Sequence, residues 1–122
     1  RDAPPAWFEV TVYRHTPLFH LEHCLFCARL SSATGPDNCG RPCDKHRIRL
    51  LDARTGAQHE VRADAGCRNT VFLEQPQNDT DWVAPLRKAG LRMFRLELLD
   101  ETPLEAARIV AEYHRLLRRD RT

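Results

Sequence analysis

Two histidines and two cysteines fall within eight positions of this sequence, in HLEHCLFC, residues 20–27. Three further cysteines follow at positions 39, 43 and 67. Side chains of these types at short spacing can ligate a metal, pair a nucleophile with its base, or pack as inert thiols. Which of these holds decides what the chain can do.

The cysteine spacing favours a metal centre. Cys24-x2-Cys27 and Cys39-x3-Cys43 form two pairs with a loop between them. Thiolates two to four residues apart on a turn can converge on one ion, and soft sulfur suits zinc or an iron–sulfur cluster. By spacing alone, these four cysteines would hold tetrahedral zinc.

The other interpretations fit less well. Inert thiols belong in a core, but the stretch SSATGPDNCGRPC, residues 31–43, consists of turn residues with little to bury. A nucleophile–base pair of Cys24 with His23 is badly placed if the segment is extended, because neighbours on a strand point to opposite faces. Zinc ligation by His20 or His23 together with cysteines stays open.

Length and composition are those of a globular protein. The chain has 122 residues and a net charge of +2, which suits one domain, 1–122, and says little about partners. Five cysteines cannot all pair, so metal ligation in a reducing, cytoplasmic compartment is the better expectation. We expect no membrane span. The arginines of RLLRRDR, residues 115–121, are typical of a solvated helix end, with an RNA contact as the alternative.

Local patterns predict the elements that position the cysteines. FEVTVY, residues 8–13, is typical of a strand. In residues 46–63, two alternating runs flank DARTG, which predicts a β-hairpin. A short strand is expected over residues 70–72, directly after Cys67.

In the last third of the chain, the pattern of apolar residues changes from that of strands to that of helices alternating with a strand. DWVAPLRKAG, residues 81–90, predicts a short helix, and residues 91–99 predict a strand. A long helix should follow, with Thr102 as N-cap, Pro103 at its first position and Glu105 completing a capping box. Helix, strand, helix is the order of an α/β unit on a parallel sheet. We therefore expect 1–73 to hold a strand, the cysteine cluster and the hairpin, and 74–122 to form this unit.

Taken together, these segments resemble the collagenase-like peptidase family U-32. EVTVYRHTPLFHLEHC is similar to the family's signature region, with Glu9 at its starting Glu and Cys24 at its second Cys. The motif's first Cys falls at Pro17, where this sequence departs. NCGRPC leading into DARTG resembles the family's Cys-x3-Cys element and hairpin, and AGCRNTVF resembles the region of its last Cys. GLRMFRLELLDETPLEAARIVAEYHRLL is similar to the terminal strand and helix of the family's barrel, so the resemblance covers nearly all of the chain.

The resemblance implies an α/β fold, namely the C-terminal portion of a TIM-like barrel with a cysteine-rich metal-binding insertion and a β-hairpin. A barrel takes about 250 residues, so the rest of a longer chain would be this segment's first partner. The absent initial Met agrees with a fragment. A stand-alone domain pinned by a metal is the alternative.

The resemblance also implies a cofactor, a 4Fe–4S cluster held by four cysteines, Cys24, Cys39, Cys43 and Cys67. Cys27 would be a spare or substitute ligand. The zinc hypothesis instead takes Cys27 and leaves out Cys67, so the two hypotheses are separable.

Two activities are attached to the family, peptidase action on collagen-like substrates and oxygen-independent hydroxylation of an RNA base or a quinone-precursor ring. A redox-active cluster has a role in hydroxylation and no obvious one in hydrolysis, which favours a hydroxylase. Arg68 and Asn69 are candidate donors to the cluster sulfurs, and Glu9 is a candidate on the substrate side. RNA or a partner subunit are candidate partners. The alternative from another class is a non-catalytic zinc-binding interaction module.

Overall fold

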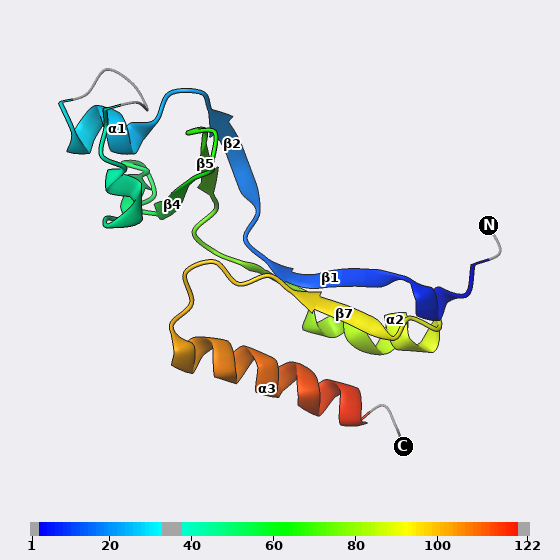
Figure 1. Cartoon of the computed structure of the whole chain (residues 1–122). Coiled ribbons are helices and arrows are strands. Elements are labelled where there is room, and N and C mark those ends of the chain that lie inside the picture. The colour runs from blue at the N-terminus through cyan, green and yellow to red at the C-terminus, as the bar shows by residue number, and fades with distance from the viewer. Residues whose placement is uncertain (1–2, 33–37, 120–122) are drawn as a thin grey trace. The chain divides into compact units, whose positions relative to one another are not determined.

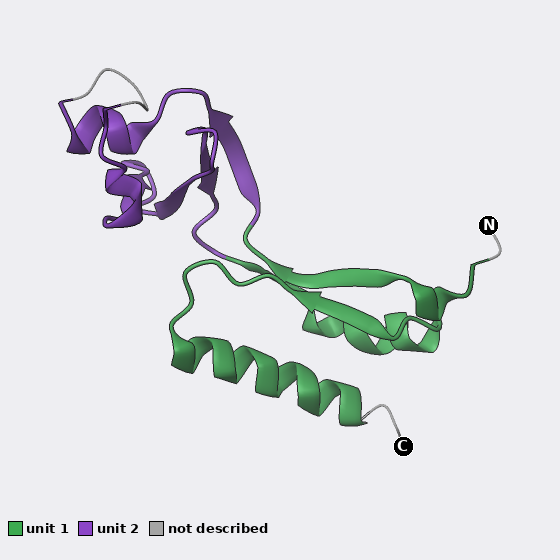
Figure 2. Ribbon diagram, in the orientation of Figure 1, with its two compact units in different colours: residues 1–15, 76–122 green, residues 16–75 purple. Residues whose placement is uncertain are grey.

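A computed structural model describes residues 3–32 and 38–119 of the chain. The fold is mixed α/β with two small sheets. It divides into two compact units (Figures 1 and 2), Arg1–His15 with Pro76–Thr122, and Thr16–Gln75. We call the first the terminal unit and the second the cysteine unit. Residues 120 and 121 of the predicted basic helix end lie outside the described residues.

The terminal unit is built on a three-stranded sheet in the order β6-β1-β7. Strand β7 lies parallel to β1, as expected for an α/β unit, and β6 pairs antiparallel with β1. The elements of this unit are η1 (Pro5–Trp7), β1 (Glu9–Arg14), β6 (Gln77–Asn78), η3 (Thr80–Trp82), α2 (Val83–Lys88), β7 (Met93–Leu96) and α3 (Pro103–Arg119).

Helix α3 begins with the predicted capping box. Thr102 N–H donates to Glu105 Oε1 at 2.9 Å, and Glu105 N–H donates to Thr102 Oγ1 at 3.1 Å. These bonds satisfy two of the free N–H groups at a helix start. The apolar side of the helix then packs on the core of the unit, whose buried residues are Val12, Tyr13, Val83 and Tyr113.

Tyr113 fixes α3 to the sheet by a polar contact as well as by burial. Its hydroxyl lies 3.1 Å from Val12 O on β1 and 2.5 Å from Asn78 Oδ1 on β6. The side chain is 3% exposed, and a buried hydroxyl is stable only when it is hydrogen-bonded. One residue therefore sets the position of α3 against two strands.

The cysteine unit contains a four-stranded antiparallel sheet in the order β2-β5-β4-β3. Its elements are β2 (Pro17–Leu21), α1 (Leu25–Leu30), η2 (Pro42–Asp44), β3 (Ile48–Leu51), β4 (Gln58–Ala63) and β5 (Asn69–Phe72). The hairpin predicted around DARTG is confirmed, with Ile48 opposite Val61 and Leu51 opposite Gln58. Gly56 in its loop has φ +78°, a conformation that favours glycine.

The two faces of β4 serve different purposes. Val61 packs with Phe26 and Val71 in the core of the unit. The neighbouring Glu60 is 3% exposed and accepts hydrogen bonds from Arg47 and Arg62. Burial by itself raises the pKa of Glu60, but the guanidinium groups outweigh it and lower the pKa below its ordinary value. The buried carboxylate is thus neutralised by paired charge.

Sequence and structure differ at a few elements. The predicted strand at 91–99 is shorter, since β7 spans Met93–Leu96, and neither β2 nor α1 was predicted. The strand β1 pairs with β7, so it lies in the same unit as the C-terminal elements. None of the described helices combines the length and the apolar character needed to span a bilayer.

Replacing Tyr113 by Phe should lower the free energy of unfolding of the terminal unit by about 1 kcal/mol, because one buried hydroxyl loses its partners. Both tryptophans, Trp7 and Trp82, lie in this unit, so urea unfolding followed by tryptophan fluorescence measures the effect. Leu104→Ala is the control on the same helix, since Leu104 is 62% exposed. An unchanged midpoint in Tyr113→Phe would contradict the role given to the hydroxyl.

Candidate metal centre

All five cysteines line one cavity of the cysteine unit, which has a volume of about 270 Å³. They come from three separate parts of the chain, namely the start of α1, the segment around η2 and the turn before β5. All five are partly exposed. The cavity lining includes Cys24, Cys27, Cys39, Cys43 and Cys67 together with His23, Arg41 and Asp64.

The first pair of cysteines is carried by α1. Cys24 is the N-cap residue of this helix and Cys27 lies in its first turn. A helical turn brings residues three apart to the same side, so both thiols reach the cavity. Ser31 Oγ lies 3.7 Å from Cys27 Sγ and donates to Cys27 O at 2.8 Å.

The second pair lies on a sharply turned segment. Gly40 and Arg41 both have left-handed φ values, +70° and +51°, and Arg41 N–H donates to Cys39 Sγ at 3.3 Å. Pro42 then begins the short helix η2, which carries Cys43. Burial raises the pKa of the Cys43 thiol, so metal binding there would release a proton.

The fifth cysteine is held by a turn organised around Asp64. Asp64 Oδ1 accepts hydrogen bonds from Gly66 N–H and Arg68 N–H, each at 2.9 Å, and Cys67 N–H donates to Asp64 O at 3.1 Å. The backbone bond from Arg68 is the main reason that the pKa of Asp64 is lowered. Cys67 adopts φ +63°, which is costly for a non-glycine residue and typical of functional sites.

Asn69 connects the turn of Cys67 to the helix of Cys24. Its side chain is fully buried, and its Oδ1 accepts the N–H of Leu25 at 2.7 Å. Its Nδ2 is buried without a hydrogen-bond partner in the part of the chain that the structure describes. A buried amide donor without an acceptor is unfavourable.

The described cysteines form no compact group of three sulfur atoms. Tetrahedral zinc with Zn–S bonds of about 2.3 Å places its sulfur ligands about 3.8 Å apart. Within residues 3–32 and 38–119, no three cysteine sulfur atoms lie within 4.8 Å of one another. A four-iron cluster binds each thiolate to a different iron, so its four ligand sulfur atoms lie further apart than those around a single ion.

The remaining residues singled out from the sequence lie in different places. His23 lines the cysteine cavity, whereas His20 Nδ1 lies 2.9 Å from Thr70 Oγ1. Arg68 Nε donates to Asp64 Oδ2 at 3.2 Å and so holds the turn. Glu9 lies in the other unit, where its half-exposed carboxylate pairs with Arg95 at 3.6 Å.

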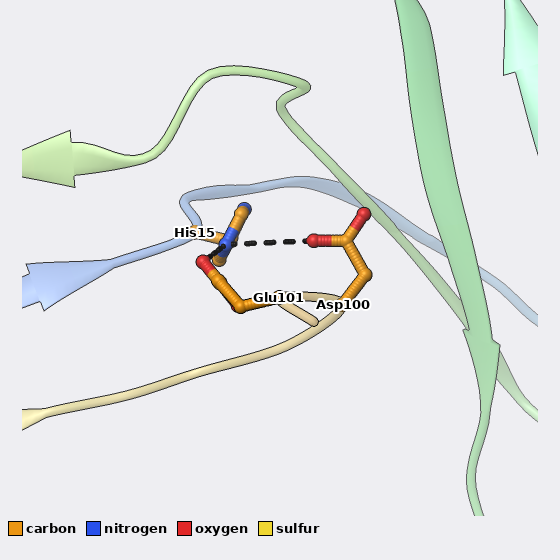
Figure 3. Close-up of side chains that lie close together, drawn as sticks. All are labelled: His15, Asp100 and Glu101. Carbon is orange, nitrogen blue, oxygen red and sulfur yellow. Dashed lines mark hydrogen bonds and ion pairs between the residues drawn. The ribbon is translucent and has the colours of Figure 1, made fainter. Parts of the chain in front are cut away.

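A second group of ligand-type side chains, which the sequence did not predict, lies in the terminal unit. His15 Nε2 lies 2.6 Å from Glu101 Oε2 and 3.8 Å from Asp100 Oδ1 (Figure 3). Both oxygens of Glu101 already have partners, since the Tyr13 hydroxyl donates to Oε2 and Leu99 N–H donates to Oε1. The group therefore fits a structural junction between β1 and the start of α3 better than a metal site. His15 and Glu101 are 86 positions apart, and no sequence pattern links them.

Glu101 is the electrostatic centre of this junction. Burial raises the pKa of its carboxyl group, but hydrogen bonds from Tyr13, His15 and Leu99 N–H outweigh that effect and lower the pKa to about 2. Burial, with the adjacent Glu101 carboxylate, raises the pKa of the Tyr13 hydroxyl. The negative charge of Glu101 is thus strongly favoured in the folded unit.

In comparison with known proteins, the chain matches no family model, no curated protein and no solved structure.

Glu101 should make the terminal unit sensitive to acid. A lowered carboxyl pKa contributes stability above its unfolded value of about 4.5, and this is lost as the pH falls towards 2. The contribution is on the order of 3 kcal/mol. Glu101→Gln should therefore lower stability at pH 7 and flatten its decline below pH 4.5, as measured by urea unfolding with tryptophan fluorescence.

The control for this experiment is Glu9→Gln, which changes a half-exposed carboxylate of the same unit. It should leave the acid profile unchanged. If Glu101→Gln loses stability with falling pH as steeply as the unmodified chain, Glu101 does not control the acid response.

Proposed function

We propose that the cysteine unit binds a 4Fe–4S cluster through Cys24, Cys39, Cys43 and Cys67. The observation that carries the proposal is the convergence of thiols from three separate chain segments on one cavity. Inert core thiols need no such arrangement, and these five are partly exposed. When bound, the cluster would supply one-electron redox chemistry.

The position of Cys67 favours a cluster over a single zinc ion. Cys67 lines the cavity despite the strained backbone that places it there. A zinc site made of the two sequence-adjacent pairs would leave this strained position without a use. Under the cluster hypothesis, Cys27 lines the cavity as a spare or substitute ligand.

The buried side-chain amide of Asn69 is a second observation in support of the cluster. Its buried Nδ2 needs an acceptor, and the residue lies two positions from Cys67 while bonding the residue after Cys24. Amide donors beside metal-bound sulfur stabilise the thiolate form and tune the metal. We assign Asn69 this role, and Arg68 the role of holding the turn.

Beyond the cluster, we propose that the chain is the C-terminal part of a protein of the U-32 type, carrying out oxygen-independent hydroxylation of an RNA base or an aromatic ring. The support is the sequence resemblance together with the redox chemistry of the cluster. The peptidase activity attached to the same family has no obvious use for such a cluster. The portion of a TIM-like barrel expected from the resemblance belongs to this proposal, and so does a cytoplasmic location.

A zinc-binding interaction module is the second candidate. It is favoured by the Cys24–Cys27 and Cys39–Cys43 spacing, which suits a structural zinc site. In that case all four ligands would come from residues 24–43, and Cys67 would be dispensable.

Replacing single cysteines separates the two candidates. In chain purified without oxygen, Cys67→Ala should abolish the broad absorption near 400 nm expected of an iron–sulfur cluster, because one of four ligands is lost. Cys27→Ala should retain it. Iron, sulfide and zinc contents measured on the same samples identify the bound centre.

The reverse pattern would reject the cluster. A colourless protein with one zinc per chain, which loses zinc in Cys27→Ala and keeps it in Cys67→Ala, supports the interaction module instead.

Asn69→Asp tests the proposed amide donor. Aspartate keeps an acceptor for Leu25 N–H but replaces the donor with negative charge near the thiolates. Release of the bound metal to a chelator should speed up by roughly 10- to 100-fold. Thr70→Val, at the neighbouring position of β5, should release metal at the original rate. Equal rates in all three proteins would show that the amide does not act on the metal.

A further inference from the structure

A group of basic side chains on α2, on α3 and directly before β7 has no part in the function proposed above. One hollow of about 400 Å³ is lined by Arg87, Arg92, His114, Leu117 and Arg118. An adjoining hollow of about 360 Å³ is lined by Ala84, Arg87, Lys88 and Arg92. We call the two together the basic hollow. Among the described residues that line the two hollows, none is acidic.

Local structure explains how these cations meet. Arg87 and Lys88 lie in the last turn of α2, and Gly90, with φ +108°, turns the chain two residues before Arg92. On α3, His114 and Arg118 are four residues apart and therefore share one side of the helix. Figure 1 shows both helices beside the β1–β7 pair within the terminal unit.

Two of the guanidinium groups are held in place by the backbone. Arg87 Nη1 donates to Leu117 O near the end of α3 at 2.5 Å. Arg92 Nη1 donates to Arg87 O and to Leu91 O, each at 2.8 Å. These bonds use one nitrogen of each group, and a guanidinium has five N–H donors. Both arginines are thus fixed in position while keeping donors for a ligand.

The described carboxylates that form ion pairs do so with other cations than those of the basic hollow. Elsewhere in the chain, Arg62 and Arg95 pair with Glu60 and Glu97. In the part of the chain that the structure describes, none of the cations lining the basic hollow forms an ion pair with an acidic side chain. Hydrogen bonds to helix carbonyls hold Arg87 and Arg92, whereas Lys88, His114 and Arg118 are exposed. Lys88 and Arg118 also lie in the last turns of their helices, where positive charge is favoured.

We propose that the basic hollow binds the phosphate group of a phosphate-bearing ligand. Planar guanidinium groups match the oxygen geometry of phosphate and bind it with two parallel hydrogen bonds. A concave surface lined by one sign of charge also concentrates its field on an anion. The ligand is a small phosphate ester or the backbone of an oligonucleotide, which share this chemistry. The proposal does not depend on the cysteine unit binding a metal.

The test is titration of the full chain with pyrophosphate and, separately, with a short single-stranded oligonucleotide, by calorimetry and fluorescence anisotropy. Arg118→Gln should weaken binding roughly tenfold and, for the oligonucleotide, reduce the salt dependence by about one ion. Lys88→Gln should weaken it in the same direction. Arg108→Gln removes the same charge from an exposed position on the same helix and should leave binding unchanged.

The two ligands distinguish the sources of phosphate. Pyrophosphate binding that is sensitive to Arg118→Gln supports the proposal and indicates a small phosphate ester, whereas binding of the oligonucleotide alone supports it and indicates a nucleic-acid backbone. The proposal is overturned if neither ligand binds, or if Arg108→Gln and Arg118→Gln weaken binding equally. Circular dichroism of each variant verifies that the exposed substitutions leave the fold intact.

Discussion

The hydrogen bond from Leu25 N–H to Asn69 Oδ1 joins two separate segments of the cysteine unit, each of which lies next to a cysteine. On one side lies the start of α1, which carries Cys24. On the other lies β5, which follows the turn of Cys67. Because Asn69 is fully buried, the bond is shielded from water. It joins two of the three chain segments whose cysteines line the cavity.

The cysteine unit combines strained turns with a regular β-hairpin. Cys67 and Arg41 both have left-handed φ values, and each is stabilised by local hydrogen bonds, around Asp64 for Cys67 and to Cys39 Sγ for Arg41. The hairpin β3–β4 is regular and contributes Val61 to the buried core of the unit. Turns that hold side chains in unusual conformations on a regular sheet are what a preorganised ligand site requires.

Each unit also buries one carboxylate and neutralises it differently. Glu60 is surrounded by guanidinium groups from its own hairpin. Glu101 instead draws together Tyr13, His15 and Leu99 N–H from the two ends of the terminal unit. Since a buried charge is tolerated only with partners, both residues specify which segments must pair. Structural demands of this kind explain the His15 group without a metal.

By itself the sequence determined the elements whose signals are local. The capping box at Thr102 and Glu105 and the DARTG hairpin need only neighbouring residues, and both are confirmed. The turn-rich spacing of the cysteines likewise predicted that they share a site. The sequence did not predict α1, the parallel partner of β1, or the Glu101 junction. Only the tertiary structure decided these, and with them the buried amide of Asn69, because each depends on contacts between residues far apart in the chain, which no local periodicity encodes.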